Sequence, residues 1–206
     1  MDSPTENVGE SHRPFHRDFE RASERAGCYT FAMRTRLFVM LPFLFTVGVL
    51  AESAAGVRWT APSGWTSEGA RPMRAATYTV AASPGDSTSA ECGVYFFGEG
   101  QGGSVDANVE RWKGQFRDGN DQPATAAIAK RTSHGLTITT IDVSGTYSGM
   151  GGPMGGHAPV PGYRLLGAIV EGPQGNVFIK FTGPVKTIAA NQGKFEQLLA
   201  SFQPEK

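Results

Sequence analysis

Three side chains in one glycine- and proline-rich stretch are the strongest candidates for chemistry in this sequence. Met150, Met154 and His157 lie within G-M-G-G-P-M-G-G-H. Thioether sulfur and imidazole nitrogen suit Cu(I), because soft donors select that ion. The same methionines also suit an adaptable surface that packs on a partner. We predict that these three residues contact a protein partner. A copper site formed by the same residues is the alternative, and no other cofactor is expected.

This stretch is expected to be a loop that connects two strands of a sheet. Residues 148–162 contain too many glycines and prolines for regular structure, and loops of this length are often functional. The strand before the loop is predicted over 136–147. After it, residues 163–184 read as two strands joined by a tight turn, the first apolar enough to be covered on both faces. We predict that this hairpin is the centre of the sheet.

The strand at 136–147 has an apolar pattern that changes phase. Leu136 and Ile138 share one phase of the alternation, whereas Ile141 and Val143 share the other. A change of phase by one residue indicates a β-bulge, which we place near 139–140.

The other elements follow from apolar periodicity and turn residues. Strands are predicted at 57–65, 74–81, 92–97 and 124–131, and helices at 105–116 and 187–202, with Ser104 as an N-cap. Trp59 and Trp65 are expected in the core. The order β-β-β-α-β-β-β-β-α predicts an α+β fold, with a mostly antiparallel sheet of about six to seven strands and two packed helices.

Several short phrases of the sequence resemble a known fold family. They are W-T-A-P-S-G-W, G-Y-R-L-L-G-A-I-V-E-G-P, F-I-K-F-T-G-P and the closing L-L-A-S-F. Together with the element order they resemble the PsbP-like α/β/α sandwich over residues 57–202, and more narrowly secreted bacterial proteins of unknown function. Relatives include an extrinsic photosystem subunit and a Ran-binding import factor, and neither has a catalytic motif that transfers to this chain. The resemblance implies a non-enzymatic binding or accessory role.

The segment 33–55 has the features of a secretory signal peptide. It begins with Met33 and the basic residues Arg34 and Arg36, continues with an uncharged apolar run, and ends in Ser53-Ala54-Ala55. The apolar run is shorter than the about 20 residues that a membrane-spanning helix needs. We predict a secreted or periplasmic protein, with an uncleaved membrane anchor as the alternative. Residues 1–32 are then expected to be a non-native extension of the reading frame or a disordered tail, and 56–206 a single α+β domain.

Charge and cysteine content exclude some classes of function. The 19 Lys and Arg balance the 19 Asp and Glu, and no basic block occurs, so nucleic acid is not an expected partner. Cys28 precedes the signal segment, which leaves Cys92 as the one cysteine of the predicted domain and excludes an intramolecular disulfide. Cys92 alternates with Val94 and Phe96, as an inert core residue does.

Enzymatic activity is not expected, although a small secreted hydrolase is a second alternative. Such an enzyme would need Cys92 with His134 or His157, or a serine nucleophile, and no G-x-S-x-G motif is present. Four cationic residues near strand ends are expected to be ordinary solvated surface, and the border of a binding face is the alternative. They are Arg71, Arg74, Arg164 and Lys180.

Overall fold

The structure is a computed structural model that describes residues 51–149 and 158–205. Within these ranges the chain forms an eight-stranded sheet, a three-stranded sheet and three α-helices. The strands of the large sheet pair antiparallel. The predicted α+β class with a mostly antiparallel sheet is confirmed. The predicted extension at 1–32 and the signal peptide up to residue 50 lie outside the described residues. No helix in the described ranges is long and apolar enough to cross a membrane.

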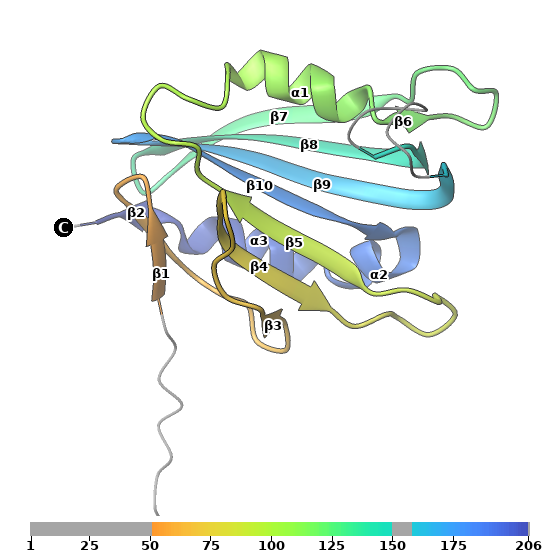
Figure 1. Cartoon of the computed structure of the whole chain (residues 1–206), viewed down its shortest axis with the longest axis horizontal. Helices are drawn as coiled ribbons and strands as arrows, with labels where there is room; N and C mark the ends of the chain where they lie inside the picture. Colours follow the sequence, from red (N-terminus) through yellow and green to blue (C-terminus); the bar gives the residue numbers. More distant parts are fainter. Residues whose placement is uncertain (1–50, 150–157, 206) are drawn as a thin grey trace, which may run out of the picture. The chain divides into compact units, whose positions relative to one another are not determined.

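Figure 1 shows the strands and helices of the chain. The strands are β1 (Ala51–Ala54), β2 (Val57–Thr60), β3 (Thr66–Ser67), β4 (Arg74–Val80), β5 (Ala90–Tyr95), β6 (Phe116–Arg117), β7 (Ala126–Ser133), β8 (Leu136–Tyr147), β9 (Val160–Gly172), β10 (Gly175–Pro184) and β11 (Gln203–Pro204). The helices are α1 (Val105–Lys113), α2 (Val185–Ala190) and α3 (Gln192–Ser201). The large sheet has the order β3-β4-β5-β10-β9-β8-β6, with β7 also paired to β8, and the small sheet has the order β1-β2-β11.

The large sheet is apolar on both faces, and each face has its own core. On one face, side chains of α2 and α3 such as Ile188 and Phe195 pack with Ile179 and Phe181 of β10. On the other face, α1 packs through Trp112 and its neighbours on β8, β9 and Phe178 of β10. Figure 1 shows α1 alone on its side of the sheet, whereas α2 and α3 lie behind it. The predicted hairpin, β9 and β10, therefore lies at the centre of the sheet, between two helical layers.

Helix α1 begins as its sequence predicts. The Ser104 side chain accepts a hydrogen bond from the backbone N–H of Ala107 at 3.2 Å, and Asp106 lies in the first turn, where the helix dipole favours negative charge.

The second predicted helix is instead two helices, α2 and α3, separated by Asn191. The Asn191 backbone has φ −108° and ψ 7°, and its side chain accepts a hydrogen bond from the Trp65 indole at 3.2 Å. The Asn191 amide also donates to the Thr187 carbonyl at 2.9 Å. These bonds satisfy polar groups at the break between the two helices.

The bulge predicted near 139–140 is wrong. Strands β8 and β9 pair without a shift from Thr137 to Gly145, and the irregularity lies between Gly145 and Tyr147. The phase of the apolar pattern changes because α2 and α3 cover one face of β8 near its start, whereas α1 covers the other face further along the strand. Leu136 and Ile138 face the core beneath α2 and α3, whereas Ile141 and Val143 face α1.

Strand β1 is formed by residues that the sequence assigned to the end of the signal peptide. It pairs with β2, and the Glu52 carboxylate accepts hydrogen bonds from the Trp59 indole at 3.1 Å and from the Tyr78 hydroxyl. Burial raises the pKa of Glu52, and the hydrogen bonds from Trp59 and Ser67 oppose this rise. The carboxylate therefore links the small sheet to β4 of the large sheet.

Cys92, Trp59 and Trp65 are core residues, as predicted. Cys92 is fully buried in the core beneath α2 and α3, and burial raises the pKa of its thiol well above the ordinary value. Trp59 stacks on Phe202, with ring centroids 5.1 Å apart.

Candidate functional site

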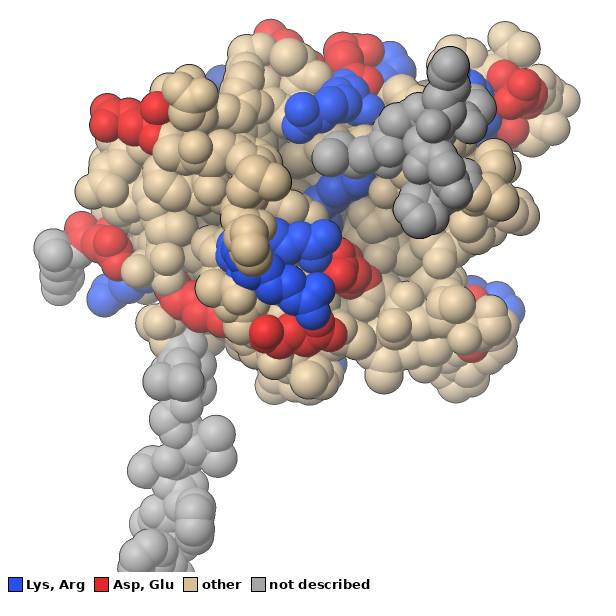
Figure 2. Space-filling view, viewed as in Figure 1, with Lys and Arg blue, Asp and Glu red and all other residues tan. Residues whose placement is uncertain are grey.

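A cavity of about 540 Å³ opens on the α1 side of the large sheet, next to the helix. Its walls come from β4, β5, β8, β9, β10 and α1. Figure 2 shows Lys and Arg atoms gathered around a hollow on this face. The lining residues are Pro72, Met73, Arg74, Ser89, Glu91, Tyr95, Phe97, Arg111, Trp112, Tyr147, Tyr163, Phe178, Lys180 and Thr182.

Lys180 of β10 lies at the floor of this pocket, between two glycines. Its register partners are Gly93 on β5 and Gly167 on β9. A Cβ atom on Gly93 would lie 2.7 Å from the Tyr95 side chain, and one on Gly167 would lie 2.7 Å from the Trp112 ring. The two glycines therefore let aromatic rings approach the sheet on either side of the lysine. A glycine inside a strand often marks such a close approach.

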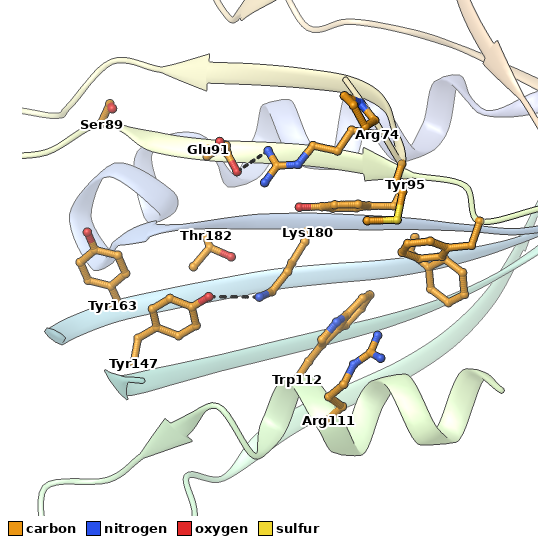
Figure 3. Close-up of a pocket in the computed structure, with 14 residues that line it drawn as sticks. Arg74, Ser89, Glu91, Tyr95, Arg111, Trp112, Tyr147, Tyr163, Lys180 and Thr182 are labelled. Atoms are coloured by element: carbon orange, nitrogen blue, oxygen red, sulfur yellow. Dashed lines mark hydrogen bonds and ion pairs between the residues drawn. The ribbon is translucent and has the colours of Figure 1, made fainter. Parts of the chain in front are cut away.

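The Lys180 ammonium is mostly buried and is held by neutral groups. It donates a hydrogen bond to Gln115 Oε1 at 2.7 Å. It donates a second one to the Tyr147 hydroxyl at 3.1 Å (Figure 3). No ion pair joins it to a carboxylate among the described residues. Burial lowers the pKa of Lys180 to about 8, and the positive charge of Arg111 acts in the same direction. Glu91 opposes this shift.

Two arginines lie at opposite walls of the pocket (Figure 3). Arg74 of β4 pairs with Glu91 at 2.8 Å and lies over the Tyr95 ring, 5.2 Å from its centroid. A register shift between Arg74 and Ala76 turns Arg74 toward this side of the sheet. Arg111 of α1 donates to the Asn108 side chain. The pocket thus has three cationic side chains and one carboxylate.

The two ends of the pocket differ in polarity. Phe97 and Phe178 form one end, with ring centroids 5.6 Å apart. Tyr147 and Tyr163 are stacked at 5.9 Å on the other side of Lys180 (Figure 3). Burial raises the pKa of the Tyr147 phenol, so that its hydroxyl stays neutral and can accept the hydrogen bond from Lys180.

Thr182 follows Lys180 on the same face of β10. Its Oγ1 atom is enclosed and has no hydrogen-bond partner in the described part of the chain. A buried hydroxyl without a partner is costly, unless a ligand provides one.

The residues predicted to bind a partner or copper, Met150, Met154 and His157, lie outside the described residues, and both predictions stay predictions. The strands that precede and follow them, β8 and β9, contribute Tyr147 and Tyr163 to the pocket. Across the described ranges, no group of three or more His, Cys, Asp or Glu side chains is placed to hold a metal ion.

Cys92 and His134, which were considered for a hydrolase, do not line this pocket, and His157 lies outside the described residues. Cys92 faces the opposite core, and its thiol stays protonated because burial raises its pKa. The His134 ring lies 3.0 Å from the Phe202 carbonyl at the turn between β7 and β8.

The expectation of ordinary solvated surface is wrong for Lys180 and holds for Arg71, which pairs with Glu68. Arg164 makes a two-point ion pair with Asp142, at 2.8 and 2.6 Å, and bonds to Gln192 of α3. Only Arg74 and Lys180 of the four line the pocket. The sequence favoured solvated surface over a binding face for Lys180, because a lysine between apolar residues of a strand looks like an outward-facing position. The signal that could have found it is the pair of glycines inside the neighbouring strands.

The sequence matches no protein-family model and no curated protein. Among solved structures, the chain is similar to a protein of unknown function from Pseudomonas aeruginosa that is described as a putative regulator. The two share 12% identity with a TM-score of 0.45, over 76% of this chain and 97% of the other. A PsbP from the cyanobacterium Synechocystis is similar at 11% identity with a TM-score of 0.47, over 75% and 90% of the two chains. The PsbP-like resemblance expected from the sequence is thus found among solved structures, and at this identity it concerns the fold alone.

Proposed function

We propose that this protein is a secreted or periplasmic binding protein without catalytic activity, and that its pocket binds a small organic anion with an apolar part. The observation that carries this proposal is the charge of the pocket. Glu91 is already paired with Arg74, whereas Lys180 and Arg111 have no carboxylate partner among the described residues. An anionic ligand would supply the charge that these two side chains lack.

Physical chemistry supports an anion at this position. An ammonium group removed from water is costly unless an opposite charge or several hydrogen bonds compensate for the loss of hydration. Lys180 has two neutral acceptors and a lowered pKa, which indicates that its charge is only partly compensated. A bound anion would favour the charged form and bring the pKa back up.

The walls of the pocket favour an apolar part on the same ligand. Six of the fourteen lining side chains are aromatic, and pockets for small molecules combine such walls with a few convergent polar groups. The signal peptide predicted at 33–55 supports export from the cytoplasm, and the resemblance to secreted proteins agrees with it.

Titration calorimetry with anilinonaphthalene sulfonate, an aromatic anion, tests this function. We expect saturable binding with one site per chain and a loss of affinity of about tenfold or more in Lys180→Met, as for a lost hydrogen bond to a charged group. Lys130→Met is the matched control, because it removes the same charge from β7, and Lys130 does not line the pocket. Absence of binding, or equal loss of affinity in the two variants, would contradict the proposal.

A further inference from the structure

We infer that the head group bound in this pocket is a carboxylate that lies between Lys180 and Thr182 on β10, with the apolar part of the ligand against Phe178. This inference rests on the proposed function and names the chemical class of the ligand. The observation that supports the inference is the order of three side chains along strand β10. Phe178, Lys180 and Thr182 alternate on β10, and all three line the pocket.

Two hydrogen-bond donors at this place have no acceptor among the described residues. The Lys180 ammonium has three hydrogens, and Gln115 and Tyr147 accept two of them. The third has no acceptor among the described residues. The Thr182 hydroxyl, enclosed and without a partner, is the second donor. A carboxylate has two oxygens, so each oxygen can accept one of these hydrogens.

The surrounding charges favour a single negative charge over two. Thr182 is the register partner of Glu91 on β5, so a ligand bound beside Thr182 also lies beside that carboxylate. Arg74 neutralises Glu91 in the unliganded pocket, which makes a monoanion acceptable. A phosphate monoester carries up to two charges near neutral pH and three acceptor oxygens. It would be repelled more strongly by Glu91, and it would exceed the two enclosed donors.

The apolar part of the ligand is placed by the same strand. Successive residues on one face of a strand are about 7 Å apart. Phe178 therefore lies about one such step from Lys180, next to Phe97 and on the side away from Thr182. Gly102 closes this end, since a Cβ atom there would lie 2.7 Å from the Phe178 ring. A phenyl group joined to a carboxylate by a short methylene chain fits this spacing.

Calorimetric titration of the protein with phenylbutyrate, phenylbutanol and phenylbutyl phosphate tests the inference. The three compounds share the phenyl ring and three methylene groups, and they end in a carboxylate, a hydroxymethyl group and a phosphorylated hydroxymethyl group. We expect phenylbutyrate to bind about tenfold or more tightly than either of the others. It should exceed the alcohol because a hydrogen bond to a charged group is stronger than one to a neutral group, and it should exceed the phosphate because Glu91 repels the second negative charge. This ranking in the unmodified protein does not depend on the folding of any variant.

Thr182→Val then tests the hydroxyl, because valine keeps the shape and removes the donor. We expect the affinity for phenylbutyrate to fall about tenfold and the affinity for phenylbutanol to change less. Thr139→Val is the matched control, since the Thr139 hydroxyl is also buried without a partner but does not line the pocket. That variant should bind phenylbutyrate as the unmodified protein does.

The outcomes separate this inference from the function on which it rests. If phenylbutyl phosphate binds as tightly as phenylbutyrate, or if Thr182→Val leaves the affinity for phenylbutyrate unchanged, the carboxylate site is wrong while the pocket still binds anions. If neither phenylbutyrate nor anilinonaphthalene sulfonate binds, the proposed function itself fails.

Discussion

The two faces of strand β10 have the same backbone and different surroundings. Val177, Ile179 and Phe181 face α2 and α3 and are fully buried among apolar side chains. The residues between them face α1, and there the strand changes from Phe178 to Lys180 and Thr182. The contrast arises because helices and the small sheet cover the two faces to different extents. Two helices and the small sheet close one face, whereas α1, with nine residues, covers mainly β8 and β9 and leaves β5 and β10 beside an open pocket.

A polar residue inside a sheet is tolerated where a helical layer ends. A charge facing α2 and α3 would be buried without water or a partner. The same charge beside α1 reaches a cavity that a ligand can fill.

The largest expected difference in stability is between alanine variants of two aromatic residues, one from each face of the sheet. Phe181→Ala should lower the free energy of unfolding by ~3–5 kcal/mol, because it leaves a cavity beside Trp65 and Phe195. Phe97→Ala should lower it by less than ~1 kcal/mol, because that ring is 38% exposed at the pocket. Urea unfolding of both variants measures the difference. Equal losses would show that the α1 face is as tightly packed as the other.

Gly167→Ala should have the next largest effect. The added methyl group would lie 2.7 Å from Trp112 and from Ile141, so α1 must move away from the sheet at a cost of ~1–3 kcal/mol. Gly193→Ala is the control on the opposite layer, because nothing lies within 4 Å of its Cβ position and alanine favours a helix. That variant should be more stable than the unmodified protein. Thermal unfolding, followed by circular dichroism, compares the two.

Raising the pH should increase the stability of the protein and lower its affinity for anions, and both changes should come from Lys180. The pKa of Lys180 is lowered to about 8, below its value in the unfolded chain, so the cost of burying its charge is present below that pH and is relieved as the pH rises through it. The contribution of Lys180 to stability should therefore increase over this window. Anion affinity should fall over the same window, because the ammonium is lost.

Lys180→Met separates this titration from the others in the protein. Calorimetry and urea unfolding at several pH values should show both trends in the unmodified protein, and neither trend in the variant. Persistence of the fall in affinity in Lys180→Met would assign it to another group.

The smallest expected effect lies on the covered side, at Glu52. Its pKa is raised, so its contribution to stability is fully present below the unfolded pKa and is lost as the pH rises through the folded value. Glu52→Gln, made in the full-length chain that retains residues 33–55, resembles the protonated form and should gain up to ~0.5 kcal/mol near neutral pH, and less in acid. Urea midpoints at two pH values test this. A gain that is larger in acid would contradict the assigned direction of the shift.

The sequence was sufficient for the parts of the fold that depend on local patterns. Apolar alternation located the strands of the hairpin, and Ser104 marked the start of α1. The pattern could not show that Leu136 and Ile141 face different helices, because that depends on where each helix packs along the sheet. This is why the phase change in β8 was mistaken for a bulge.

The pocket was harder to predict, because it depends on register. Lys180 became notable only when Gly93 and Gly167 were found beside it on neighbouring strands. Arg74 reached the pocket through an irregularity of β4 that its sequence does not mark. Residues distant in sequence thus created the site.

The burial of Cys92 limits what its free thiol can react with. In an exported protein, as proposed above, an accessible free thiol would form mixed disulfides during oxidative folding. Here the thiol is sealed in the core and kept protonated by its raised pKa, so oxidants and foreign thiols react with it only when the sheet opens. The rate at which a thiol reagent labels Cys92 in the native protein therefore measures how often the sheet opens. Labelling of this thiol thus reports on the stability of the folded domain.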